Sequence, residues 1–313
     1  MKKLIAALLL VGHLPAAAAC GDLDAPRGVP EADQGQWALA SLNLWRLRDA
    51  TRESDLDDAL PVALVEDRLD SISEFIAEDL KAPHALVLQE VENKALLDSL
   101  AQRLRAKGLR YFSVLIEGND PSGMDVGLLY REPIQVDSVA ALYANEQFQR
   151  GPLYSRPPLH IALAKPLALD LVAVHMRSAR NLGSARVYQK RRQQSSRLAH
   201  WVRENRERRV IVAGDFNSSW GKGRFSDSYN RFRSAKLVNV WDRLPENERF
   251  SYRYRCRPQA LDHIWISVSL EDSVERVAVS RGNAGRYQKL YGSKGVSPVS
   301  DHDVLVVYFS EGR

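Results

Sequence analysis

The sequence predicts an α+β fold in which sheets pack face to face and helices lie outside them. Short apolar runs rich in β-branched residues recur along the chain, and some, such as 210–213, are apolar at consecutive positions. Strands of this kind are covered on both faces. Segments with helical periodicity lie between these runs. Because two-sided sheets must be buried, the simplest arrangement places sheet on sheet with the helices outside.

The predicted strands begin after a lead, residues 20–36, that carries Gly, Pro and Asp. Each strand is predicted from a short run of apolar or aromatic residues, the composition that favours strands. These runs cover residues 37–44, 85–88, 111–115, 126–130, 159–163, 171–174, 210–213, 264–268 and 304–309. No linker, internal repeat or low-complexity segment follows residue 36, so the sequence predicts one catalytic domain over 37–313.

Helices are predicted between the strands from the spacing of leucine and other apolar residues. Residues 62–80 and 94–107 each place their apolar side chains on one helical face. A third helix is predicted over 184–206. Helices interleaved with strands complete the α+β prediction.

The first residues have the order of an export signal. Lys2 and Lys3 precede the apolar run 4–11, and the small-residue segment 16–19 follows before Cys20. The apolar run is shorter than the roughly 20 residues that a membrane span needs. We therefore predict a signal peptide over 1–19 and an exported protein that is periplasmic, secreted or lipid-anchored in a bacterial envelope.

Cys20 fits two interpretations. A Cys directly after small residues resembles the lipid-attachment box of bacterial lipoproteins, although Ala17 stands where that box usually has Leu. Alternatively the signal is simply cleaved, and Cys20 is free to form a disulfide with Cys256 in an oxidising compartment. The sequence leaves both interpretations open.

Positive charge is concentrated in one part of the chain. The formal net charge is +5, of which Lys2 and Lys3 belong to the predicted signal. The segment 177–209 contains Arg177, Arg180, Arg186, Lys190, Arg191, Arg192, Arg197, Arg203, Arg206, Arg208 and Arg209 against Glu204 and Glu207. Such a field attracts polyanions. The alternative is a solvated helix face that keeps the protein soluble.

Polar residues stand where the apolar runs end. Glu90, His175 and Asp215 each follow directly on a predicted strand, and Asp262 precedes one. Because unpaired buried charge is costly, converging carboxylates require a cation or a histidine partner. Oxygen ligands without a thiolate pair favour Mg²⁺, with Mn²⁺ or Ca²⁺ as alternatives, over Zn²⁺. The sequence has no Gly-rich phosphate loop and no Gly-x-Ser-x-Gly elbow.

The polar boxes, taken in order, resemble the signature of the endonuclease/exonuclease/phosphatase superfamily. The boxes are Ser41-Leu42-Asn43-Leu44, Leu88-Gln89-Glu90-Val91, Asp125 in Met124–Leu129, His175, Gly214-Asp215-Phe216-Asn217, Leu261-Asp262-His263-Ile264 and Ser300-Asp301-His302-Asp303. The resemblance spans about residues 37 to 310. It implies a DNase I-like fold, a four-layered α/β sandwich of two packed mixed β-sheets flanked by helices. It also implies metal-dependent hydrolysis of a phosphate ester.

The resemblance implies metal ligands and catalytic residues. Glu90 resembles the principal metal carboxylate, with Asn43 beside it and Asp301 as an additional carboxylate near the metal. Asp215 and Asn217 match the pair that orients and activates the attacking water.

Two histidines complete the implied catalytic set. Asp262 and His302 match the Asp-His pair at the phosphate. His175 matches a second histidine, which a nearby Glu supports in the DNase I branch, and Glu117 is the candidate for that support. His263 is predicted to be structural.

The substrate prediction depends on residues around this set. Arg156 stands where the family often has an Arg, Asp125 belongs to one of the boxes, and Arg177 opens the basic segment. Arginines alternate with aromatics over 249–257, which includes Tyr254 and Arg255 and suits phosphate contacts and base stacking. The alternative is an edge strand with alternating faces.

The combined prediction is an exported metal-dependent phosphodiesterase that hydrolyses nucleic acid, with DNA favoured over RNA as substrate and an endonuclease favoured as the activity. One fold hosts many activities, so a sphingomyelinase-like or other phosphodiesterase or phosphatase is the alternative. A second alternative is a non-enzymatic lipoprotein that binds polyanions on an inactive scaffold. The sequence gives no sign of an oligomer.

Overall fold

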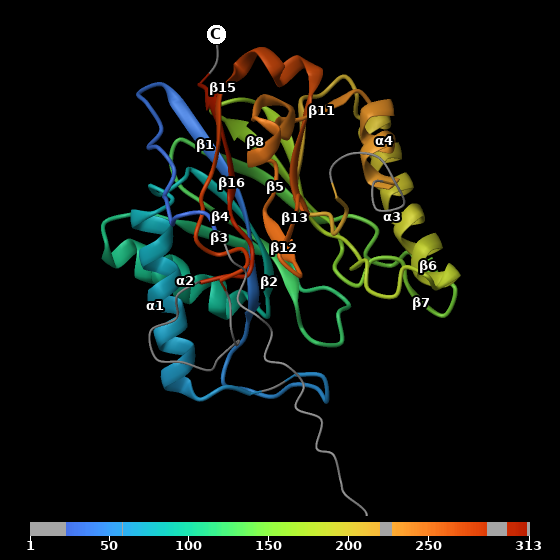
Figure 1. The fold of residues 1–313 in the computed structure, drawn as a ribbon, viewed down its shortest axis with the longest axis horizontal. Coiled ribbons are helices and arrows are strands. Elements are labelled where there is room, and N and C mark those ends of the chain that lie inside the picture. Colours follow the sequence, from blue (N-terminus) through green and yellow to red (C-terminus); the bar gives the residue numbers. More distant parts are fainter. Residues whose placement is uncertain (1–22, 58, 220–226, 287–298, 312–313) are drawn as a thin grey trace, which may run out of the picture.

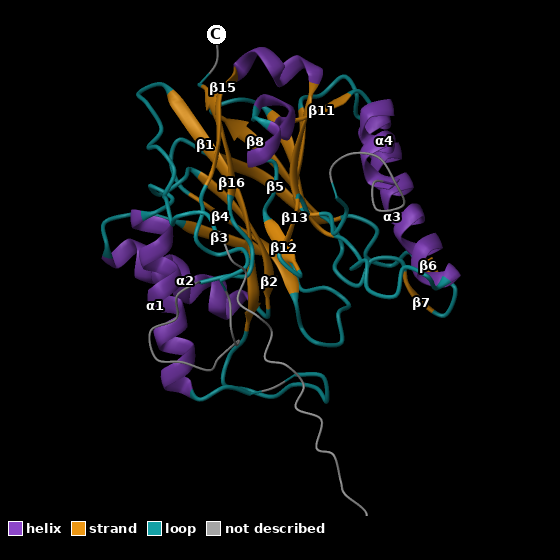
Figure 2. Ribbon diagram, viewed as in Figure 1, coloured by secondary structure: helices purple, strands orange, loops and turns teal. Residues whose placement is uncertain are grey.

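The computed structural model describes residues 23–57, 59–219, 227–286 and 299–311. Within these residues two six-stranded sheets lie face to face, with helices on both outer sides (Figure 1). Figure 2 shows the same arrangement, with the helices outside the strands. Among the described helices, none combines the length and the apolar character needed to cross a membrane. The predicted fold class is confirmed.

The first sheet has the strand order β15-β16-β1-β2-β4-β3. Its strands are β1 (Gln36–Leu47), β2 (Ala85–Val91), β3 (Phe112–Leu115), β4 (Asp125–Tyr130), β15 (Val274–Val279) and β16 (Leu305–Ser310). β1 and β2 run parallel, whereas the other neighbours are antiparallel, so the sheet is mixed.

The second sheet has the order β11-β14-β10-β9-β8-β5. Its strands are β5 (Gln135–Ala141), β8 (Leu159–Lys165), β9 (Leu169–His175), β10 (Val210–Asp215), β11 (Leu237–Asn239) and β14 (Asp262–Ser267). Only β9 and β10 pair in parallel here. Two short hairpins, β6–β7 and β12–β13, lie outside both sheets; their strands are Gln147–Phe148, Gly151–Pro152, Tyr252–Tyr254 and Arg257–Gln259.

The described helices are α1 (Val62–Glu78), α2 (Lys94–Ala106), α3 (Ala185–Glu204) and α4 (Asp227–Ser234). The first three confirm the helices predicted from periodicity, with slightly shorter bounds. Asn93 explains where α2 begins, because its side chain accepts a hydrogen bond from Leu96 N at 3.0 Å. Three 3₁₀ helices, η1 (Val240–Arg243), η2 (Glu246–Glu248) and η3 (Val268–Ser273), connect later elements.

The buried clusters explain why residues 210–213 of β10 are apolar at every position. Ile211 and Ala213 belong to the cluster between the two sheets. Val210 and Val212 point the other way and pack with Leu198 of α3. On the far side, α1 and α2 cover the outer face of the first sheet. The sheets are therefore covered on both faces, and the four layers expected from the sequence are present.

The segment 249–257 forms part of a hairpin. Tyr252–Tyr254 pairs with Arg257–Gln259, and Arg255 and Cys256 form the turn with positive φ angles of 47° and 64°. Cys256 is disulfide-bonded. The predicted signal peptide and Cys20 lie outside the described residues, so their interpretation stays a prediction.

Candidate active site

Strand register brings the predicted catalytic residues together. Asp215 at the end of β10 pairs with His175 at the end of the parallel β9, and with Asp262 at the start of the antiparallel β14. In the first sheet, Asn43 of β1 pairs with Gln89 of β2, beside Glu90. The ends of strands from both sheets therefore meet at one place, as the predicted strand ends indicated.

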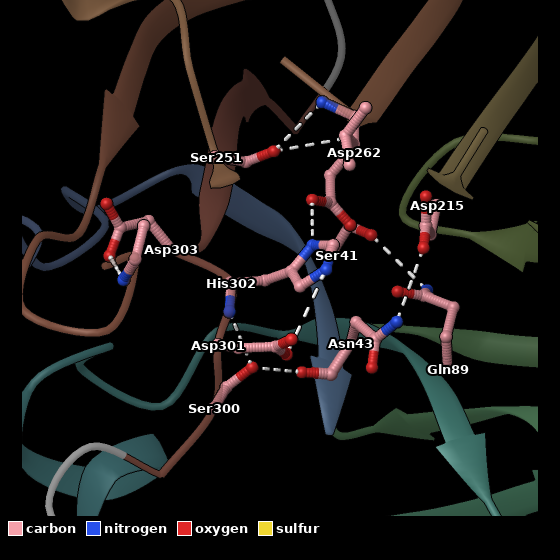
Figure 3. A network of polar contacts seen from close by, with 12 residues as sticks. Ser41, Asn43, Gln89, Asp215, Ser251, Asp262, Ser300, Asp301, His302 and Asp303 are labelled. Atoms are coloured by element: carbon pink, nitrogen blue, oxygen red, sulfur yellow. Dashed lines mark hydrogen bonds and ion pairs between the residues drawn. The ribbon is translucent and has the colours of Figure 1, made fainter. Parts of the chain in front are cut away.

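His302 and Asp262 form a close buried pair. His302 Nδ1 lies 2.6 Å from Asp262 Oδ2 (Figure 3). The Asp262 backbone is held in turn, because its N–H donates to Ser251 Oγ at 3.1 Å. The loop of His302 is held by Ser300, whose hydroxyl accepts from His302 N at 2.9 Å and donates to Asn43 O at 2.6 Å. The pair is thus fixed from both sheets.

The charge around His302 favours its protonated form. Burial by itself would lower the pKa of the imidazole, but the carboxylates of Asp262 and Asp301 raise this pKa well above its usual value. Asp301 Oδ1 lies 4.0 Å from Nε2, on the other side of the ring from Asp262. The surroundings of His302 therefore favour the imidazolium form.

His175 has the opposite character. Its ring is buried, and burial, together with the positive charges of Arg156 and His302, lowers the pKa of His175 well below its usual value. Nε2 lies 3.5 Å from Asp215 Oδ2, while Nδ1 has no hydrogen-bond partner among the described residues. Glu117, the candidate support for this histidine, is an exposed residue in the loop after β3. The carboxylates beside the ring are instead those of Asp215 and of Glu90, whose Oε1 lies 3.9 Å from Nε2.

Asn43 links the two sheets across the site. Its Nδ2 donates to Glu90 Oε1 at 3.1 Å and to Asp215 Oδ2 at 3.3 Å. The second Glu90 oxygen accepts from Arg46 N at 2.9 Å. Asn217 holds Asp215 from its other side, donating from Nδ2 at 3.0 Å and from its backbone N–H at 2.7 Å. The carboxylates are therefore fixed before any substrate binds.

The crowding of carboxylates fits a bound cation. Burial and the charge of Asp262 raise the pKa of Asp215 to about 7, and burial raises that of Asp301 to about 6, with Glu90 adding to the shift. One oxygen of Asp262, Oδ1, is buried without a hydrogen-bond partner among the described residues. Ligand atoms of Asp215, Asp262 and His302 lie within 4.8 Å of one another. These oxygen-rich surroundings suit a hard divalent ion.

The predicted substrate-binding residues occupy the margin of this cluster. Arg156 forms an ion pair with Asp120 at 3.3 Å, and its charge reaches both His175 and Arg177. Asp125 is buried and accepts a hydrogen bond from Gly118 N at 2.9 Å, so it holds the loop that precedes β4.

The β12–β13 hairpin also borders the site. The Tyr252 ring lies 4.9 Å from the His302 ring between centroids. At the hairpin tip, Tyr254 is 52% exposed, and the Arg255 guanidinium lies 5.4 Å from the centre of its ring. The structure thus leaves the Tyr254 side chain open to solvent on an element that contacts His302.

His263 has structural contacts only among the described residues. Its Nδ1 lies 2.9 Å from Asn239 Nδ2, and its Nε2 lies 2.7 Å from Ser218 O. Burial lowers the pKa of His263 to about 4. The contacts agree with the structural interpretation of this residue.

Sequence reasoning missed the residues that hold the catalytic loops. Arg281 is buried, forms an ion pair with Asp303 at 3.0 Å and donates to Phe250 O at 2.8 Å. It thus connects the loop of His302 to the segment that carries Ser251. Arg191 of α3 donates to Asn217 O at 2.7 Å. No local motif marks these residues, because their partners are remote in sequence.

Comparisons with known proteins agree with this geometry. A family model described as Endonuclease/Exonuclease/phosphatase family matches residues 40–302. No curated protein matches the sequence at a significant level.

Similar solved structures cover most of the chain. An AP endonuclease from Archaeoglobus fulgidus has a TM-score of 0.63 at 16% identity, covering 87% of this chain and 99% of its own. The 3' phosphatase NExo from Neisseria, bound to product DNA hairpin, has a TM-score of 0.61 at 15% identity, with the same two coverages. A humanized TDP2 of D. rerio has a TM-score of 0.58 at 19% identity, covering 88% and 99%. At these identities the likeness shows the fold.

Proposed function

Since this chain belongs to the endonuclease/exonuclease/phosphatase family, a family of hydrolytic phosphoesterases and nucleases, we propose that it is an exported, metal-dependent phosphodiesterase that cleaves DNA internally. The proposal depends on one observation. His302, whose Nδ1 lies 2.6 Å from Asp262 Oδ2, stands close to the carboxylates of Glu90 and Asp215. A cation, a cationic acid and a neutral base are the groups that hydrolysis of an anionic diester requires.

The two histidines divide the proton transfers in this proposal. His302, positively charged and oriented by Asp262, neutralises charge on the phosphate and holds the proton for the leaving oxygen. His175 is neutral and is available as a base. Asp215, oriented by Asn217, positions the attacking water. Two titratable groups whose surroundings shift their pKa values apart are the pattern expected of an acid and a base.

The metal residues in this proposal are Glu90 and Asp301, with Asn43 between Glu90 and Asp215. The two carboxylates interact, because the charge of Glu90 contributes to the raised pKa of Asp301. Because His302 is assigned to proton transfer in this proposal, the carboxylates are left as the ligands. A divalent ion bound there would supply Lewis-acid stabilisation of the charge that develops on the phosphate. Oxygen ligands favour Mg²⁺, with Mn²⁺ or Ca²⁺ as alternatives.

Nucleic acid is the proposed substrate for three reasons. Two of the similar structures are a phosphatase bound to a DNA hairpin and an AP endonuclease. The charge of Arg156 acts on His175, and Arg177, two residues after His175, lies near Arg156. The exposed Tyr254 and Arg255 are suited to base stacking and phosphate contact. Export, which the predicted signal peptide 1–19 supports, would suit degradation of environmental DNA.

The test is product release from supercoiled plasmid, RNA and sphingomyelin by the mature protein with Mg²⁺, Mn²⁺ or EDTA, alongside His302→Ala. We expect nicked and then linear plasmid, abolished by EDTA and by the substitution. Turnover of sphingomyelin without cleavage of either nucleic acid would overturn the nuclease proposal. Binding of DNA without turnover of any substrate would favour the non-enzymatic, polyanion-binding alternative.

A further inference from the structure

Two cations near the catalytic cluster, Arg177 and Lys190, form no ion pair within the described residues. Arg177 and Lys190 are both partly buried. Neither forms an ion pair with a carboxylate in the part of the chain that the structure describes. The acidic group that acts on both is Asp120, and it is already paired with Arg156 at 3.3 Å. Two charged side chains are therefore partly buried while they share one carboxylate with Arg156.

The α3 helix brings these cations together. Arg186 and Lys190 are spaced i, i+4, so their side chains lie on one face, where like charges repel. Arg177 is held against the same helix, because its N–H donates to Gln194 Oε1 at 3.1 Å and its carbonyl accepts from Arg191. The arrangement is thus built into the contacts of α3 with the loop after β9.

The energetic effect of this grouping is unfavourable for the protein alone. Burial, together with the charges of Arg177, Arg186 and Arg156, lowers the pKa of Lys190. Arg186 also stands in the first turn of α3, which has no acidic residue, and a cation there opposes the helix dipole. A cluster that lowers stability in this way is expected to bind an anion.

We propose that Arg177 and Lys190, with Arg186 at their edge, form a subsite for a second phosphate of the substrate, next to the phosphate that reacts. The proposal rests on the proposed function and restricts the class of substrate. The substrate is a chain of phosphodiesters and not a single ester. His175 and Arg177 are two residues apart, so their Cα atoms are separated by at most about 7 Å. The subsite therefore lies beside the catalytic histidine.

The test compares two substrates that differ in the number of phosphates. Bis(4-nitrophenyl) phosphate is a diester with a single phosphate, whereas an oligonucleotide has a row of them. In Arg177→Gln and Lys190→Gln, we expect the ratio of kcat/KM for the oligonucleotide to that for the small diester to fall about tenfold, the loss expected for one charge-assisted contact. Arg105→Gln removes the same charge from an exposed position in the last turn of α2, outside the basic segment 177–209, and should keep the ratio of the wild type.

A binding measurement gives a second readout that needs no turnover. With EDTA present, the dissociation constant of a labelled oligonucleotide is measured over a range of salt concentration. The slope of log Kd against log salt should fall by about 1 for each subsite cation removed. The slope should not change in Arg105→Gln.

The outcomes separate the two proposals. If the wild type cleaves DNA but the subsite variants match Arg105→Gln in both the ratio and the slope, the subsite is wrong and the nuclease proposal stands. If the wild type neither cleaves nor binds DNA, both proposals fail.

Discussion

The two buried histidines of the site differ because of the charges that surround each ring. His302 lies between Asp262 and Asp301, whereas His175 is buried near the positive charges of Arg156 and His302. Identical side chains are thereby prepared for opposite proton transfers. Histidine suits such a division because its ordinary pKa lies close to neutral pH.

The Asp262–His302 pair gives the first prediction. Replacing His302 by Ala, or Asp262 by Asn, should lower kcat by about 10² to 10⁴-fold, because each removes the oriented, charged imidazole. The double variant should lose little more than either single variant, since the two residues act as a unit. Steady-state kinetics on the cleaved substrate measures this. The exposed His200→Ala is the control, and multiplicative losses in the double variant would show that the residues act separately.

A histidine outside the site makes stability depend on pH. Ala38 N donates to His84 Nδ1 at 3.0 Å, which requires a neutral ring. Burial and the charge of Arg131 lower the pKa of His84 from 6.5 to about 4. Because the folded pKa lies below the unfolded one, the stabilisation is present above pH 6.5 and is lost as the pH falls toward 4.

This sign gives the second prediction. Between pH 7 and pH 5 the free energy of unfolding should fall by about 1 to 2 kcal/mol more in the wild type than in His84→Gln; the partial exposure of the ring reduces the effect. Urea unfolding of both proteins at the two pH values measures the difference. Equal losses in the two proteins would show that His84 is not responsible.

At the scale of elements, the parallel contact of β9 and β10 positions His175 beside Asp215. Gly214 makes this contact possible. Its φ is 142°, and a Cβ at this position would lie 2.0 Å from Val174 O. The backbones of the two strands therefore approach at a point where any other residue would push them apart.

The third prediction follows from this close approach. Gly214→Ala should destabilise the protein by about 3 kcal/mol or more, because the clash is with backbone and the φ angle is unfavourable for alanine. Gly151→Ala is the matched control, since no atom lies within 4 Å of its added Cβ. Urea unfolding compares the two variants. Equal stability of both would show that β9 and β10 can separate without cost.

At the scale of the whole molecule, the site exists only where the two sheets meet. Glu90 and Asn43 come from the first sheet, and Asp215 and Asp262 from the second. An ion held by Glu90 and Asp301, which are remote in sequence, binds the folded state alone. Such a ligand stabilises the protein in proportion to the logarithm of its concentration over its dissociation constant.

The fourth prediction concerns this linkage. Mg²⁺ or Mn²⁺ at a hundredfold excess over its dissociation constant should add about 2.7 kcal/mol and raise Tm by several degrees. Differential scanning calorimetry with and without the ion measures the shift. Glu90→Gln should lose most of it, whereas Glu117→Gln, on an exposed residue, should keep it. An unchanged shift in Glu90→Gln would remove Glu90 from the metal site.

The fold could be predicted in large part because buried positions are occupied by apolar residues, which are visible in the local sequence. Val210 to Ala213 faces helices on one side and the other sheet on the other, so every position is apolar. The apolar faces of α1 and α2 predicted the first and last residues of these helices to within two positions. β5 was missed, since most of its residues are partly or fully exposed and its sequence has no apolar run.

The sequence by itself determined the strands, the helices and the polar groups at the strand ends. It also determined the family resemblance, because the residues that carry it are local boxes in a fixed order. The tertiary structure alone decided which charges meet. Arg281 reaches Asp303, and Arg191 reaches Asn217, across long stretches of chain. Electrostatic effects depend on distance and burial in space, and neither is encoded in the spacing of residues along the chain.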